Sequence, residues 1–129
     1  MSIIVKNGLF SPDEAGKVVF VEVTPDSNPL ELKDELSSVD GFRIHFPSSA
    51  DGRGFSIART LRNLGFKGYL RASGHVLADQ YPLAVRCGFD DVEISADLAD
   101  RQPEVQWLDA YSRVEGTYRE TLMQRRNAA

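Results

Sequence analysis

Polar side chains stand at the predicted ends of four strands, the place where α/β proteins bind ligands. Each lies one residue before a strand end: Glu22, His45, Arg71 and Glu93. A histidine beside carboxylates can act as a general acid or base, and an arginine can bind a carboxylate, phosphate or sulfate through two hydrogen bonds. We therefore predict one site on one side of a sheet, with His45, Glu22 and Glu93 as candidate catalytic groups. His75 and Asp79 are predicted to close this site, Asp79 as a further catalytic candidate. A buried salt-bridge network on a polar sheet face is the alternative interpretation.

The segment over residues 47–56 combines glycines, hydroxyl groups and an arginine directly before a predicted helix. Glycines let backbone N–H groups approach an anion closely, and the amino end of a helix adds partial positive charge. Ser56 is predicted to cap that helix, and Arg53 and Arg71 are predicted to converge on one anion near it. The predicted anion-binding residues are Asp51, Arg53, Ser56, Arg71 and Gln80. A tight turn before a capped helix is the alternative interpretation.

Positive charge is concentrated in the middle of an acidic chain whose formal net charge is −4. Residues 52–78 carry five basic side chains and no acidic one. This distribution favours a small anionic metabolite as ligand, and it argues against binding of nucleic acid or of an anionic membrane. Ion pairs between these bases and the acidic flanks are the alternative interpretation.

The sequence excludes several common kinds of site. One cysteine, Cys87, and two histidines match no zinc spacing, so no metal is expected. A single cysteine forms no intramolecular disulfide, and no secretory signal or apolar run of about 20 residues is present, so a cytoplasmic protein is expected. The chain lacks a Walker A loop, a dinucleotide fingerprint and a G-x-S-x-G elbow, which leaves its cofactor and reaction unidentified.

Secondary structure is indicated by turn residues and by a repeated glycine–phenylalanine pair. Asn7-Gly8 between apolar residues predicts a β-hairpin over residues 3–10. The pairs Gly41-Phe42, Gly65-Phe66 and Gly88-Phe89 recur 24 and 23 residues apart. Each glycine is predicted to end a helix in the left-handed conformation before the next strand. The expected strands are 18–23, 42–46, 69–72 and 92–94, and the expected helices include 30–36, one starting at Ser56, and one from Glu104 to about Leu122.

These elements predict a single α/β domain over residues 1–129, with a hairpin followed by four βα units and a parallel sheet. A half-barrel-like arrangement and a small doubly wound sheet both fit. Polar and apolar residues alternate in the strands, whereas strands covered on both sides are apolar throughout. This favours the half-barrel-like arrangement, with the hairpin or a second subunit over the polar face. A homodimer is therefore expected.

Three segments of the chain resemble bacterial domain-of-unknown-function family 934 over about Val39 to Ile94. They are residues 46–62 (FP…DGRGFSIAR…LR), 70–80 (LRASGHVLADQ) and 86–90 (RCGFD). The resemblance implies an oxidoreductase linked to assimilatory sulfite reduction, because genes of this family lie beside those of assimilatory sulfite reductase. The family pattern gives weight to Asp51, Arg53, Arg71, Asp79, Gln80, Arg86 and Cys87. His75 falls at a position where the family has no fixed residue.

Two classes of function stay open at this point. One is a small anion-binding oxidoreductase in sulfur assimilation that uses the Arg53 loop and the polar strand face. The other is a non-catalytic accessory protein that binds sulfite reductase or a related enzyme. A bound anion at Arg53 and Arg71 would favour the first class, whereas an exposed surface without a pocket would favour the second.

Overall fold

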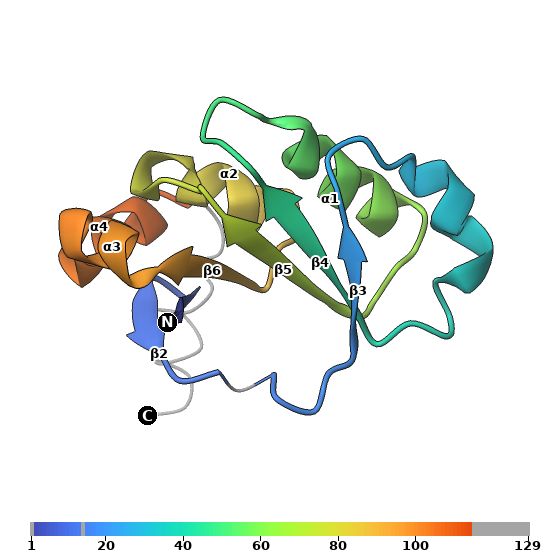
Figure 1. Cartoon of the computed structure of the whole chain (residues 1–129), viewed down its shortest axis with the longest axis horizontal. Coiled ribbons are helices and arrows are strands. Elements are labelled where there is room, and N and C mark those ends of the chain that lie inside the picture. Colours follow the sequence, from blue (N-terminus) through green and yellow to red (C-terminus); the bar gives the residue numbers. More distant parts are fainter. Residues whose placement is uncertain (1, 14, 115–129) are drawn as a thin grey trace, which may run out of the picture.

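The computed structural model describes residues 2–13 and 15–114, which form a six-stranded sheet in the order β2-β1-β6-β5-β4-β3 (Figure 1). The strands are β1 (Ser2–Lys6), β2 (Leu9–Ser11), β3 (Phe20–Val23), β4 (Gly41–Phe46), β5 (Tyr69–Gly74) and β6 (Asp91–Ser95). Strands β3 to β6 are parallel, and the hairpin of β1 and β2 adds two antiparallel strands beside β6. The predicted α/β class is confirmed.

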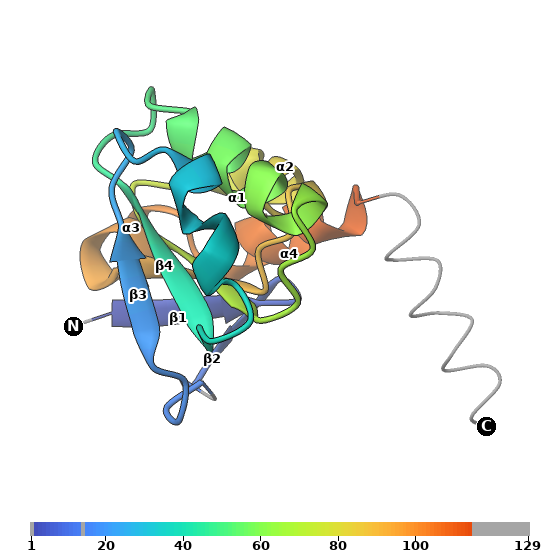
Figure 2. The ribbon, with the colours of Figure 1, turned by 90° about the vertical axis from the view of Figure 1, so that its right-hand side faces the viewer.

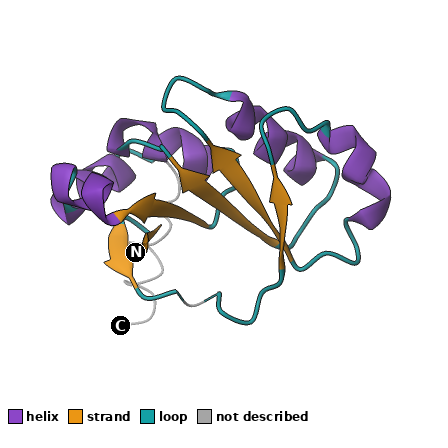
Figure 3. Ribbon diagram, in the orientation of Figure 1, coloured by secondary structure: helices purple, strands orange, loops and turns teal. Residues whose placement is uncertain are grey.

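Helices follow each parallel strand. They are η1 (Pro29–Glu35), α1 (Arg53–Asn63), η2 (Ala78–Gln80), α2 (Tyr81–Arg86), α3 (Ala96–Arg101) and α4 (Glu104–Ser112), where η marks a 3₁₀ helix. Consecutive parallel strands are neighbours in the sheet, so the chain winds in one direction and right-handed crossovers place η1, α1 and α2 on one face. Figure 3 shows these helices above the open sheet, with the β2–β3 connection below it. A doubly wound sheet would need a reversal of strand order, which this sheet lacks.

Alternation along the strands separates an apolar face from a charged one. Phe42, Ile44 and Leu70 point toward the helices and are fully buried. Arg43 and Arg71 occupy the intervening positions and therefore point to the opposite face. The hydrophobic core thus lies between the sheet and its helices, and charged side chains gather on the other side.

Two of the three predicted glycine caps are confirmed. Gly65 has a φ of +99° and donates its N–H to the carbonyl of Arg62, while Phe66 donates to the carbonyl of Leu61. These two bonds define a Schellman motif. The same pair of bonds ends α2 at Gly88, where φ is +103°.

The two glycines make a matched test of backbone strain and packing. Alanine at Gly65 would meet no atom within 4 Å, whereas alanine at Gly88 would place its Cβ 2.6 Å from Cγ of Arg62. We expect Gly65→Ala to lower the free energy of unfolding by about 1–2 kcal/mol, from the left-handed backbone alone. Gly88→Ala should lower the free energy of unfolding by at least about 1 kcal/mol more than Gly65→Ala does, because Arg62 must move. Urea denaturation of both variants measures this, and equal losses would contradict it.

Several predicted boundaries are wrong, each for a local reason. Helix α1 starts at Arg53 rather than Ser56, because the Asp51 carboxylate accepts the Arg53 N–H and because Phe55 must be helical to pack on Phe46. The third cap fails because Gly41 opens β4 and lies in the sheet.

Other differences concern the edges of elements. Strand β5 runs to Gly74, two residues further than predicted. The hairpin extends the sheet instead of covering its charged face. Helix α4 ends at Ser112, and the rest of the helix predicted to about Leu122 lies outside the described residues after Val114.

Candidate functional site

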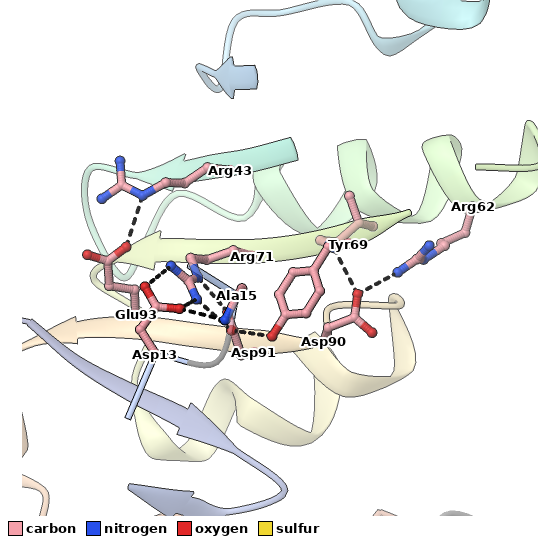
Figure 4. Close-up of polar contacts among 10 residues, drawn as sticks. Asp13, Ala15, Arg43, Arg62, Tyr69, Arg71, Asp90, Asp91 and Glu93 are labelled. Atoms are coloured by element: carbon pink, nitrogen blue, oxygen red, sulfur yellow. Dashed lines mark hydrogen bonds and ion pairs between the residues drawn. The ribbon is translucent and has the colours of Figure 1, made fainter. Parts of the chain in front are cut away.

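The face of the sheet away from the helices carries the residues that the sequence singled out, and we call it the charged face (Figure 4). It is formed by Glu22 of β3, Arg43 and His45 of β4, Tyr69, Arg71 and Ser73 of β5, and Asp91 and Glu93 of β6, with Asp13 from the β2–β3 connection. The prediction that Glu22, His45, Arg71 and Glu93 point to one side is confirmed. They do not lie in one row, because the longer β5 places Arg71 level with Arg43 and Ser73 level with His45.

Arg71 is enclosed by two carboxylates and an aromatic ring. Its Nε and Nη2 donate to the two carboxylate oxygens of Asp91 at 2.8 and 2.9 Å. Its Nη1 and Nη2 donate to the carboxylate of Asp13 at 3.1 and 2.8 Å. The guanidinium also lies 4.9 Å from the centre of the Phe20 ring. The Arg71 side chain is 5% exposed, so its donors are committed within the protein.

Burial and ion pairing compete at this cluster, and ion pairing prevails. Burial alone would lower the pKa of Arg71, but the hydrogen bonds that Arg71 donates to Asp91 and Asp13 raise it above its ordinary value. Tyr69 donates its hydroxyl to Asp91 at 2.6 Å. Burial and this hydrogen bond raise the pKa of Tyr69, which keeps the phenol protonated. Arg71 therefore stays positively charged and Tyr69 stays neutral near neutral pH.

A second cluster is built around Arg43. Its Nε donates to Glu93 at 2.9 Å and its Nη1 to Glu22 at 2.7 Å, so the arginine links the neighbouring strand β3 to β6, which lies beyond β5. The Nε2 of His45 lies 3.5 Å from the same Glu22 carboxylate. Burial, the largest single effect, would raise the pKa of Glu93, but hydrogen bonds from Arg43 and Ser2 together with the positive charges of Arg43 and Arg71 lower it overall.

The carboxylate of Asp13 makes the stability that this network contributes depend on pH in the acid range. The hydrogen bonds from Arg71 are the largest cause of its lowered pKa. A lowered pKa contributes stability that is present above the unfolded value near 3.8 and is lost as pH falls through the folded value. Because Asp13 is half exposed, we expect Asp13→Asn to cost under about 1 kcal/mol at pH 7. Thermal melts from pH 7 to 3 should show this difference shrinking, and a difference that grows in acid would contradict it.

The loop before α1 does not bring Arg53 and Arg71 together. Arg53 donates Nε and Nη2 to the two oxygens of Asp51 at 3.0 and 2.8 Å, and its side chain is 61% exposed. It begins α1, which lies on the helix side of the sheet, whereas alternation in β5 places Arg71 on the charged face. The predicted convergence on one anion is therefore wrong. Anion binding by Arg53 alone stays a prediction of the anion-binding enzyme class and is not part of the accessory-protein class.

The remaining predicted site residues lie around the same loop. Gln80 donates to the carbonyl of Ser49 at 2.8 Å and accepts the N–H of Leu77 at 3.0 Å, so it ties the loop before α1 to the start of η2. Ser56 and Asp79 are exposed. His75 is exposed as well, and Cys87 is buried, with burial raising the pKa of its thiol.

Sequence reasoning missed the residues that complete these networks. Asp91 and Arg43 share the alternation phase of Glu93 and His45, so the strand pattern contained a signal for both. Asp13 lies in an irregular connection 58 residues from Arg71, and no periodicity indicates it.

Arg62 is the largest omission. Its guanidinium donates to the carbonyls of Phe66, Gly68 and Gly88 and to the carboxylate of Asp90 at 2.8–3.1 Å. Asp90 in turn accepts the N–H of Leu70 at 2.8 Å. Figure 4 shows Arg62 reaching Asp90 beside Tyr69. Arg62 thus fastens the end of α1 to the segments that lead into β5 and β6.

Comparison with known proteins gives one family and no individual relative. The family model described as a bacterial protein of unknown function (DUF934) matches residues 20–128. No curated protein and no solved structure matches this chain. In the part of the chain that the structure describes, no helix is long and apolar enough to cross a membrane, and no three His, Cys, Asp or Glu side chains are placed to hold a metal ion.

Proposed function

Because this chain belongs to DUF934, a bacterial family of unknown function, we propose that it is a non-catalytic accessory protein of assimilatory sulfite reduction. In this role it binds sulfite reductase or a related enzyme. The family resemblance supports the pathway, and the chemistry of the charged face favours an accessory protein over an enzyme.

The observation that carries this choice is the internal use of Arg71. An anion-binding enzyme needs donors that are free to meet its substrate. Arg71 instead donates four hydrogen bonds to the carboxylates of Asp91 and Asp13. Arg43 is likewise committed to Glu22 and Glu93. Both arginines therefore stabilise the sheet, and the buried Arg71 is enclosed by its carboxylate partners, which disfavours a small anion at its guanidinium.

The outer members of the charged face suit a partner protein. Glu22 and His45 are 53% and 37% exposed, and Asp13 is 48% exposed. Exposed carboxylates and an imidazole on an open surface favour a complementary protein surface, where such groups direct orientation and association rate. The central ion pairs would hold these outer groups in fixed positions.

Sedimentation velocity with purified assimilatory sulfite reductase from the same bacterium tests the proposal. We expect a complex with micromolar affinity that Glu22→Lys weakens by about tenfold. Glu31→Lys, an equal charge change on an exposed glutamate of η1, is the matched control and should bind like wild type. The proposal would be contradicted if no complex formed at protein concentrations about 50-fold above a micromolar dissociation constant. An equal loss of binding in Glu22→Lys and Glu31→Lys would also contradict it.

The same sedimentation runs on the protein alone report its oligomeric state. The homodimer stays a proposal. Strand β3 forms an edge of the sheet, and Val19 and Val21 beside that edge are 71% and 37% exposed. Such an apolar edge is surface that a second copy would cover. A monomer at all micromolar concentrations would contradict the homodimer.

A further inference from the structure

A groove separate from the charged face lies on the helix side, between η1 and the turn that follows α1. Figure 2 shows η1, in cyan, beside α1 in green. The groove has a volume of about 490 Å³, within the range of small-molecule sites. It is lined by Lys33, Leu36, Ser37, Val39, Leu64, Gly65, Lys67 and Gly68.

The floor of the groove is apolar and incompletely covered. Helix η1 has no buried residue, although its Leu32 packs against the core and is partly buried. Leu36 and Val39 contact the hydrophobic core on one side and remain partly exposed toward the groove. Leu64 is also half-buried at this surface. An apolar group placed here would remove these side chains from water, which is favourable in proportion to the area covered.

Two lysines line the groove, and both side chains are exposed to solvent. Lys33 comes from η1 and Lys67 from the turn before β5, and both are exposed. Among residues 2–13 and 15–114, neither ammonium group forms an ion pair. This distinguishes them from Arg43, Arg62 and Arg71, which are all paired. The carboxyl end of α1 carries partial negative charge, so attraction for an anion has to come from these lysines.

We propose that this groove binds a free small organic anion with an apolar body, such as an aromatic or aliphatic sulfonate or carboxylate. The anionic group lies between Lys33 and Lys67, and the apolar body covers Leu36, Val39 and Leu64. This binding site is independent of the accessory role proposed for the charged face.

Titration with 8-anilinonaphthalene-1-sulfonate tests the site, because this probe joins a sulfonate to an apolar body and fluoresces when it leaves water. We expect saturable fluorescence with the folded protein. Lys33→Gln and Lys67→Gln should each weaken binding by about tenfold, the effect of one charged contact. Lys17→Gln, an exposed lysine outside the groove, is the matched control and should leave binding unchanged.

A second variant blocks the groove without touching the lysines. Gly65 lines the groove with a left-handed backbone and open space at its Cβ position, and asparagine tolerates that backbone. Gly65→Asn should reduce binding while the cooperative thermal melt persists. The inference is overturned if the double lysine variant binds the probe like wild type, or if Lys17→Gln weakens binding equally. It is also overturned if inorganic sulfate competes as well as sodium octanoate, since the apolar floor would then take no part.

Discussion

Replacement of Arg71 by methionine is expected to lower the free energy of unfolding by about 3–5 kcal/mol. The carboxylate of Asp91 is 1% exposed, and Arg71 supplies its positive partner. Removing the guanidinium leaves Asp91 a buried charge with only the Tyr69 hydroxyl as its remaining donor in the charged-face network. Methionine keeps much of the volume, so the loss reports electrostatics more than a cavity. Urea denaturation followed by circular dichroism measures it.

Two companion variants separate the causes. Asp13→Asn removes a charge from the exposed side of the same guanidinium, and its cost should stay under about 1 kcal/mol. The double variant Arg71→Met with Asp91→Asn should recover part of the loss, because it removes the uncompensated charge. If Arg71→Met costs no more than Asp13→Asn, the pair with Asp91 does not stabilise the sheet as argued.

Replacement of Arg62 by alanine is expected to lower the free energy of unfolding by about 2–4 kcal/mol. The substitution removes the guanidinium that donates hydrogen bonds to the carbonyls of Phe66, Gly68 and Gly88. It also removes the cation beside Asp90, whose carboxylate positions the Leu70 N–H at the start of the parallel pairing. The helix end and both strand entries lose their common anchor, so the effect should exceed that of an ordinary surface arginine.

Arg59 on the same helix provides the matched control. It is exposed, and Arg59→Ala should change stability by less than about 0.5 kcal/mol. Arg62→Lys should recover little of the stability that Arg62→Ala loses, because one ammonium group cannot replace the planar guanidinium that donates to several carbonyls. Equal costs for Arg59→Ala and Arg62→Ala would show that the carbonyl contacts are not needed for stability.

The strand pattern was sufficient to predict which side of the sheet would be charged. Alternation of apolar Phe42 and Ile44 with Arg43 and His45 fixes two faces because side chains in a strand alternate strictly. The Gly65 cap was also predictable, since its geometry depends on a short segment with one glycine and one apolar residue. These features are local, and local sequence determines them.

The pairing on the charged face was not predictable, because it depends on contacts between distant segments. A two-residue difference in where β5 ends decides whether Arg71 lies level with His45 and Glu93 or with Arg43 and Asp91. Asp13 reaches Arg71 from an irregular connection that crosses the sheet (Figure 1). The cationic middle segment suggested a ligand, whereas Arg62 and Arg71 neutralise carboxylates of the same chain.

Calorimetric titration of the wild-type protein with sulfite and with sulfate tests most directly whether the arginines are structural. With Arg71 committed to Asp91 and Asp13, we expect no saturable heat at millimolar concentration of either anion. The contrary result is saturable binding of sulfite or sulfate that Arg53→Ala weakens by about tenfold while the melting temperature is unchanged. That result would return the protein to the class of anion-binding enzymes.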